Sequence, residues 1–327
     1  MNHRKTPLRR LAAALLLALA LCTECLAAAP AYLIPGGNAV GIKLYAGGLL
    51  ITALDDGAPA QKAGLRAGDT IIEVNGDAVQ TAKDLTDRVQ DGQPLVVRVQ
   101  RGAKQAEYLL SPARQGSIYR LGAHIRDNIA GIGTVTFYDP ETGVCGALGH
   151  GVNDLGGTNL LRTTGGILVS ARVAGVVKST RGTPGELKGD FDVSSRIGLV
   201  SQNEAHGIFG RLLRAPQHEA VPVASAAQVH TGKAVILANV DGSSVQEYCV
   251  RIDKLYPQAK NGRNLLLTVT DERLLEKTGG IVQGMSGSPI LQDGRLVGAV
   301  THVLVNHPEQ GYGVLMETML AQCDSYK

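Results

Sequence analysis

Residues 284–302 read GMSGSPILQDGRLVGAVTH, and this stretch decides how the C-terminal half of the chain is interpreted. The glycine two residues before Ser286 permits a backbone conformation in which the N–H groups of Gly284 and Ser286 point into one spot. The Gly-Ser-Pro that follows lets the chain turn away tightly, and an apolar strand comes after it. Ser286 is therefore predicted to be a nucleophile, with the two N–H groups as its oxyanion hole.

The wording of this stretch resembles chymotrypsin-like serine proteases, in which G-x-S-G-[GS]-P is followed by L-V-G-x-V. In those proteases the later strand pairs with the substrate backbone. The resemblance implies that the substrate strand here consists of Ala299, Val300, Thr301 and His302.

A serine nucleophile needs a general base, and His150 is the best-placed histidine. It stands in Leu148-Gly149-His150-Gly151, directly after an apolar run, and 136 residues before Ser286. His302 competes for the role, but its position on the predicted substrate strand suits pocket lining better.

The third member of a catalytic triad would be a carboxylate that orients the histidine. The sequence offers Asp190, Asp192 and Asp271. Spacing alone favours Asp190 or Asp192, about forty residues after His150, as in the ordinary trypsin-like order.

Residues 58–76 read APAQKAGLRAGDTIIEVNG and strongly resemble the PDZ family. The resemblance covers residues 36–112. Such domains bind extended peptides as an added strand and hold a terminal carboxylate with backbone N–H groups of a glycine-containing loop. We expect this loop to be formed by Gly37, Asn38, Ala39, Val40, Gly41 and Ile42; the alternative is a β domain that only acts as a spacer.

The composition agrees with a mainly β protein of two domains. The 327 residues include 41 glycines, 3 phenylalanines and no tryptophan, with short apolar runs between turn residues. A breaker-rich linker at 111–116 separates the PDZ domain from a second domain at 117–327, for which we expect a chymotrypsin-like double β-barrel.

Residues 1–29 form a predicted signal peptide or membrane anchor. A basic start precedes the apolar run Leu11–Cys22 and the small residues of Ala27–Ala29, so the protein is expected to be exported. Four basic residues and one glutamate in this segment account for the whole formal charge of +3. The rest of the chain is neutral, which argues against nucleic acid as a partner.

Beyond this segment only Cys145, Cys249 and Cys323 remain, too few for a disulfide framework. Cys145 lies five residues before His150, but no second pair with zinc-ligand spacing accompanies it. We therefore predict no metal and no organic cofactor.

The whole chain resembles the stage IV sporulation protein B family of serine peptidases. The residues that carry the resemblance are Gly149-His150-Gly151 and the stretches 32–37 (YLIPGG), 182–189 (GTPGELKG) and 270–289. For the triad the resemblance implies His150, Asp271 and Ser286, which differs from the choice that spacing favours.

The same resemblance implies a signalling peptidase in the space between forespore and mother-cell membranes. It would cut a membrane-bound regulator of an intramembrane protease that processes a sigma factor, and would also cleave itself. The PDZ module would regulate cleavage, with its own chain as one candidate ligand. Two alternatives remain: a catalytically inactive PDZ adaptor, and a general quality-control protease, in which the two domains normally follow the reverse order.

Overall fold

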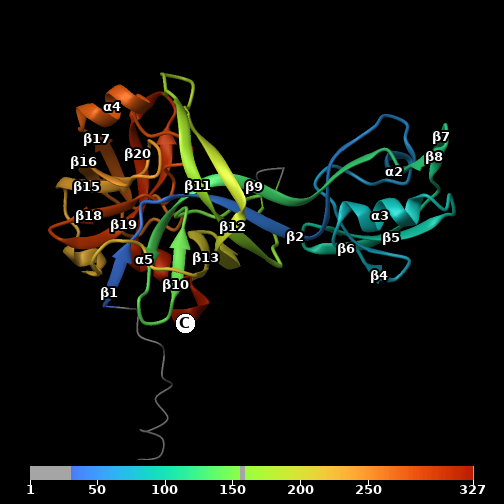
Figure 1. Cartoon of the computed structure of the whole chain (residues 1–327), viewed down its shortest axis with the longest axis horizontal. Helices are drawn as coiled ribbons and strands as arrows, with labels where there is room; N and C mark the ends of the chain where they lie inside the picture. The colour runs from blue at the N-terminus through green and yellow to red at the C-terminus, as the bar shows by residue number, and fades with distance from the viewer. Residues whose placement is uncertain (1–30, 155–158, 327) are drawn as a thin grey trace, which may run out of the picture.

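The computed structural model describes residues 31–154 and 159–326, and it shows a large β body joined to a smaller module (Figure 1). Two long strands run from one part into the other: β2 (Ala39–Leu54) and β9 (Ala123–Tyr138). They pair with each other over most of their length. The prediction of a mainly β fold is confirmed.

The smaller module is a PDZ-type β domain with its own core. Ile71, Val97 and Leu110 are completely buried in it, together with Leu49 and Ile51 from the end of β2. Its other elements are α2 (Pro59–Lys62), β3 (Thr70–Val74), β4 (Asp77–Ala78), α3 (Ala82–Val89), β5 (Leu95–Arg101), β6 (Lys104–Leu110), β7 (Ala113–Gln115) and β8 (Ile118–Arg120).

Helix α3 begins at a capping box. Thr81 accepts a hydrogen bond from the Asp84 N–H, and the Asp84 carboxylate accepts one from the Thr81 N–H, which is a capping box. Leu85 and Val89, four residues apart, are buried on the inner face of the helix. The helix is thus fixed at its start by the cap and along its length by the core.

Six strands of the large body form the first barrel. Their pairing runs β9-β10-β13-β12-β11-β2 and closes through the β2–β9 pair. Strands β1 and β14 extend this sheet along β9. The strands not yet given bounds are β1 (Tyr32–Pro35), β10 (Val144–Ala147), β11 (Gly165–Val177), β12 (Glu186–Glu204), β13 (Gly207–Leu212) and β14 (Val221–Pro222).

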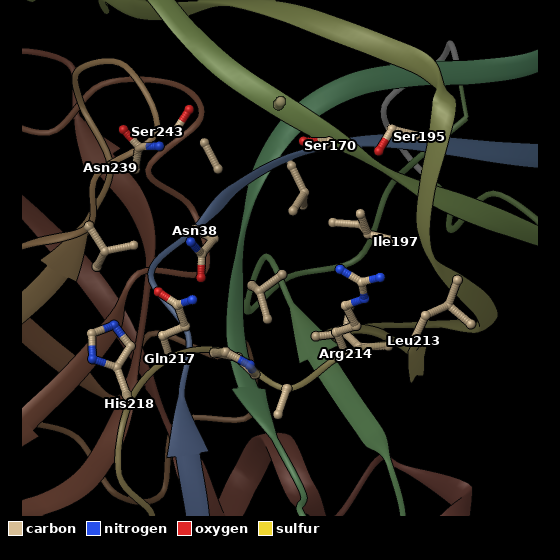
Figure 2. Close-up of a pocket in the computed structure, with 18 of the residues that line it drawn as sticks. Asn38, Ser170, Ser195, Ile197, Leu213, Arg214, Gln217, His218, Asn239 and Ser243 are labelled. Atoms are coloured by element: carbon tan, nitrogen blue, oxygen red, sulfur yellow. The ribbon is translucent and has the colours of Figure 1, made fainter.

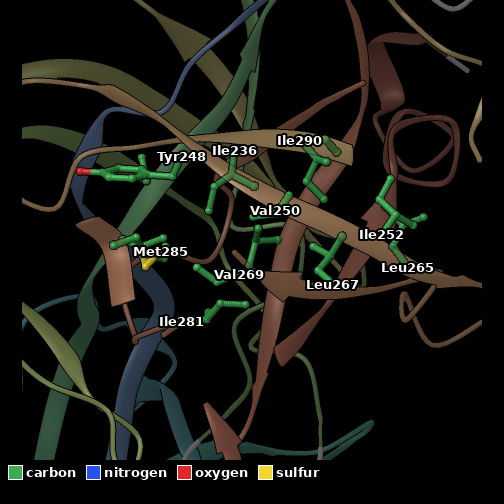
Figure 3. Close-up of a cluster of buried hydrophobic side chains, with 14 of the residues drawn as sticks. Ile236, Tyr248, Val250, Ile252, Leu265, Leu267, Val269, Ile281, Met285 and Ile290 are labelled. Carbon is green, nitrogen blue, oxygen red and sulfur yellow. The ribbon is translucent and has the colours of Figure 1, made fainter. Parts of the chain in front are cut away.

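Six further strands form a second closed barrel, so the predicted double barrel is confirmed. Its apolar interior is filled by side chains such as Ile236, Val250 and Leu267, as Figure 3 shows. The elements of this half are η1 (Ala226–Gln228), β15 (Gly232–Ala238), β16 (Gln246–Leu255), β17 (Leu265–Val269), α4 (Glu272–Thr278), β18 (Pro289–Gln292), β19 (Arg295–Leu304), β20 (His307–Leu315), α5 (Met316–Leu320) and η2 (Asp324–Tyr326).

The PDZ module is inserted into the first barrel rather than placed before it. The first half of β2 pairs with β11 on one edge and with β9 on the other, so residues 39–45 belong to the barrel. This corrects the expected PDZ boundary of 36–112. The reason is that one strand serves both parts, and its apolar pattern is equally suitable for either.

No helix within residues 31–154 and 159–326 is long and apolar enough to cross a membrane. The signal peptide or anchor predicted at 1–29 lies outside the described residues. None of the three cysteines of the described chain forms a disulfide; Cys145 and Cys323 are buried and Cys249 is exposed.

Candidate active site

The Ser286 turn connects α4 to β18 in the second barrel and presses against the first. Gly284 and Gly287 have φ angles of +99° and +98°, a region that only glycine adopts readily. A Cβ on Gly287 would lie 2.1 Å from the Thr134 carbonyl oxygen and 2.5 Å from the Leu148 nitrogen. Glycine at this position therefore lets the serine turn approach the chain that leads to His150.

The backbone of this turn leaves two hydrogen-bond donors unused. Within the described residues, no group accepts from the N–H of Gly284 or of Ser286, whereas the N–H groups of Met285 and Gly287 are both bonded to carbonyl oxygens. Donors at these two positions are what an oxyanion hole requires. The geometry thus suits the predicted oxyanion hole of Gly284 and Ser286.

Thr134 of β9 holds the turn in place, a contact that sequence reasoning missed. Its N–H donates to the Ser286 carbonyl oxygen at 3.0 Å, and its Oγ1 donates to the Gly284 carbonyl oxygen at 2.8 Å. Thr134 is buried. These bonds fix the peptide units that follow Gly284 and Ser286, and so they hold the backbone on either side of the two N–H groups that have no acceptor among the described residues.

His150 follows β10 through two residues with positive φ, Leu148 (69°) and Gly149 (67°). Its Nδ1 lies 2.8 Å from the Gly151 carbonyl oxygen. Since a carbonyl only accepts, Nδ1 carries the proton and Nε2 is the basic nitrogen, the form a general base needs. Burial lowers the pKa of His150, which favours this neutral form at pH 7.

His150 and Ser286 line the same cavity, about 240 Å³ in volume. Its walls are largely apolar: Ile42 and Leu44 come from β2, and Ile129 and Ile132 from β9. The structure therefore brings the predicted base and nucleophile together, and places them beside the strands that lead to the PDZ module.

The Ser286 hydroxyl is in a resting position. Its Oγ donates to the Thr301 carbonyl oxygen at 2.9 Å, and the described structure contains no hydrogen bond between Ser286 and His150. Rotation about χ1 would be needed to direct the hydroxyl to the histidine.

The predicted substrate strand lies on β19, but only part of it is available. Ala299 is paired with β18 on one edge and with β20 on the other, and Val300 uses its N–H and carbonyl groups on Ser288 and Gly287. The prediction is therefore wrong for Ala299 and Val300. Thr301 and His302 lie beyond the last β18 pair and keep one edge open.

Asp271 does not contact His150, which contradicts its predicted place in a triad. Its carboxylate caps α4 by accepting from the Arg273 N–H at 3.0 Å, and it also accepts from the Arg273 guanidinium and from the Cys249 N–H. The hydrogen bonds from Arg273 are the main reason that the pKa of Asp271 falls to about 2. This carboxylate is fully used by its own helix and strand.

The other two carboxylates are not in the site either. Asp190 and Asp192 are exposed on β12, and Asp192 accepts hydrogen bonds from Ser194. No carboxylate in the described chain forms a hydrogen bond or an ion pair with His150. Within the described residues, the hydrogen bond that orients its ring is the one to the Gly151 carbonyl.

A second imidazole lies beside the first. The ring centroids of His150 and His302 are 5.3 Å apart, at an interplanar angle of 40°. His302 is exposed at its surface but partly desolvated where it meets the neighbouring ring, and this desolvation, followed by electrostatic repulsion from His150 and Arg263, lowers its pKa to about 4. His302 is thus neutral at pH 7 and lies beside His150, although it is not among the residues that line the cavity of about 240 Å³.

The predicted PDZ loop, Gly37–Ile42, is in the wrong place for that role. Val40, Gly41 and Ile42 are paired on both edges within the first barrel, so no peptide strand can be added there. Asn38 instead lines a cavity of about 780 Å³ between the barrels, among polar residues such as Gln217 and Asn239 (Figure 2). This cavity contains neither His150 nor Ser286.

A loop that is better suited to bind a peptide carboxylate precedes β9. Within the described chain the N–H groups of Leu121 and Gly122 have no acceptor, and Gly122 has a φ of +68°. The Gln90 side chain, at the end of α3, binds both the N–H and the carbonyl of Tyr119. The loop therefore lies against a helix end and leads into a strand, β9, whose residues 123–126 pair only with β2 among the described strands.

Two family models match this chain. The family model of the SpoIVB peptidase S55 matches residues 117–320, and a PDZ-domain model matches residues 50–101. The HhoB protein of Synechocystis is 44% identical over 68 residues, a stretch that covers 20% of this chain and 16% of HhoB.

Solved structures show more distant similarity. The PDZ domain of an SdrC-like protein from Listeria monocytogenes is 21% identical, with a TM-score of 0.23, over 24% of this chain and 88% of that domain. The Rv3671c protease of M. tuberculosis, in an inactive form, is 14% identical, with a TM-score of 0.35, over 58% of this chain and 82% of its own.

Proposed function

Because the chain belongs to the SpoIVB peptidase S55 family, and is thus a serine peptidase with a PDZ domain, we propose that Ser286 and His150 cleave peptide bonds as a dyad. The observation that carries this proposal is the pair of free N–H groups at Gly284 and Ser286, on a turn that shares a cavity with His150.

The proposed reaction uses only groups of the chain and water. The Ser286 hydroxyl leaves the Thr301 carbonyl, gives its proton to His150 Nε2 and attacks the substrate carbonyl carbon. The Gly284 and Ser286 N–H groups stabilise the oxyanion, and His150 then protonates the leaving amine. Water hydrolyses the acyl-enzyme by the same steps, while the Gly151 carbonyl takes the orienting role of the missing carboxylate.

We propose that the PDZ module binds an extended peptide along the open edge of β9. Its terminal carboxylate would accept from Leu121 and Gly122, and the peptide would run antiparallel to β9 toward residues 129–132. Those residues line the catalytic cavity. A substrate held by the module would thus be directed to Ser286.

In the cell, we propose a role in sporulation signalling. The protein would be exported to the space around the forespore, anchored or free, and would cleave a membrane-bound regulator of an intramembrane protease, leading to sigma-factor processing. Membership in the SpoIVB peptidase family and the PDZ domain support this role. Self-cleavage near the N-terminus would limit its action.

The test is a strain of the source bacterium that produces only the Ser286→Ala protein. We expect normal engulfment of the forespore, no sigma-factor processing, and an uncut N-terminus by intact-mass spectrometry. Normal sigma-factor processing would reject the signalling role. Accumulation of misfolded exported proteins instead would favour a quality-control protease.

A further inference from the structure

The open part of β19 continues past the nucleophile with one edge free. Its pairs with β18 end at Ala299, whereas its pairs with β20 continue to Leu304. An extended substrate can therefore add as an antiparallel strand along residues 301–303. This argument depends on the peptidase function proposed above.

The position of Ser286 sets the register of that added strand. In the resting state its hydroxyl donates a hydrogen bond to the Thr301 carbonyl oxygen. When the hydroxyl turns to attack, this hydrogen bond is broken and the oxygen can accept another one. The N–H of the substrate residue that contributes the scissile carbonyl can then donate to the Thr301 carbonyl oxygen. In an antiparallel ladder the preceding substrate residue lies directly opposite His302, with its side chain on the same face.

The face around that residue is basic. Tyr312 is the β20 partner of His302, and the Arg263 guanidinium carbon lies 5.2 Å from the centroid of the Tyr312 ring. The centroid of the His150 ring lies 5.3 Å from that of the His302 ring. Arg263 and His302 are both exposed.

No acidic group of the described chain neutralises this face. Neither Arg263 nor His302 forms an ion pair there, although other arginines of the second barrel, such as Arg251 with Asp253, do. The Arg263 guanidinium lies over the Tyr312 ring and is exposed, so it can bind an anion from the solvent side. A carboxylate can reach it from the substrate.

We infer that the substrate residue immediately before the one that contributes the scissile carbonyl is acidic, and that Arg263 and His302 recognise it. At neutral pH Arg263 supplies the charge and His302 a neutral N–H donor. Because the pair is exposed, we expect an advantage of about fivefold for the carboxylate over its amide.

The experiment uses two peptides that differ only by Glu or Gln at this position. Their binding to the full-length Ser286→Ala protein is measured by calorimetry at low salt, so that the result does not depend on turnover. We expect the Glu peptide to bind about fivefold more tightly, and the advantage to disappear in 1 M NaCl.

Variants then assign the preference to residues. We expect Arg263→Gln to bring the Glu and Gln affinities together, Arg263→Lys to keep most of the difference, and the matched control Arg251→Gln to leave it unchanged. Equal affinities in the parent protein, or a preference that survives both Arg263→Gln and high salt, would overturn the inference.

These measurements distinguish a failure of the proposed peptidase mechanism from a failure of the proposed acidic recognition. If the Glu peptide binds more tightly but the wild-type protein hydrolyses neither peptide, the peptidase mechanism is wrong and the recognition of an acidic residue stands. If both peptides are cleaved and bound equally well, the mechanism stands and the acidic recognition is wrong.

Discussion

The Ser286 turn and the Asp271 cap lie 15 residues apart in the second barrel, and they use their polar groups in opposite ways. Asp271 accepts hydrogen bonds from its own helix and from the neighbouring strand. The Ser286 turn has two N–H donors that lack an acceptor among the described residues, and they lie beside a cavity. Unused hydrogen-bonding capacity, rather than residue type, distinguishes the catalytic position from the structural one.

The largest effect is expected at Ser286. Ser286→Ala should lower the kcat/KM for a peptide by about a millionfold and leave the melting temperature nearly unchanged, because it removes the nucleophile and no core contact. Ser288→Ala is the matched control: Ser288 is completely buried and its Oγ has no partner among the described residues, so turnover should persist. Loss of activity in the control alone would move the nucleophile to Ser288.

The pH dependence of kcat/KM tests the state of His150. Burial lowers the pKa of this base below its ordinary 6.5, so the protein should stay active into mildly acidic solution. Below that pKa the rate should fall about tenfold per pH unit as the imidazole is protonated. A pH–rate profile with its acid limb above pH 7 would contradict the buried, neutral histidine.

The Thr134→Val variant tests whether the N–H donors of Gly284 and Ser286 depend on hydrogen bonds from β9 for their orientation. Thr134→Val removes the Oγ1 hydrogen bond to the Gly284 carbonyl and keeps the side-chain shape. We expect kcat to fall about tenfold with little change in KM, because a misaligned oxyanion hole affects the transition state most. Steady-state kinetics decide this, and an unchanged kcat would show that the turn is rigid by itself.

Asp271→Asn should change stability more than rate. The pKa of Asp271 is about 2 in the folded protein, compared with an ordinary 3.8. Its ionised form therefore stabilises the fold above about pH 4, and this contribution is lost as pH falls toward 2. We expect the variant to lose about 1 to 2 kcal/mol at pH 7 and to differ little from wild type near pH 2.

Denaturant unfolding at the two pH values measures this difference in the free energy of unfolding. The kcat/KM of Asp271→Asn for a peptide should stay within about twofold of wild type. A variant with a wild-type melting curve and a rate reduced about ten-thousandfold would restore Asp271 to a triad. Asp192→Asn, on the exposed face of β12, is a control in which neither property should change.

The sequence predicted the parts of the site that depend on local chemistry. The glycines around Ser286 and the histidine after an apolar run are each defined by a few neighbouring residues. Residues 37–42 could not be assigned in this way, because their apolar alternation fits a PDZ strand and a barrel strand equally well. Only the pairing of β2 with both β9 and β11 separates the two.

Contacts between segments that are distant in the sequence could not be predicted either. The approach of His302 to His150 depends on how the two barrels pack, and no spacing rule encodes it. For Asp271 a local signal was present, since a capping carboxylate followed two residues later by Arg273 favours an ion pair within the helix.

The rate of active-site labelling by a fluorophosphonate, followed by intact-mass spectrometry, tests the serine–histidine dyad most directly. We expect a single adduct on wild type, none on Ser286→Ala, a strongly slowed reaction with His150→Ala, and the wild-type rate with Asp271→Asn. A wild-type rate with His150→Ala, or a loss of labelling in folded Asp271→Asn, would contradict the account.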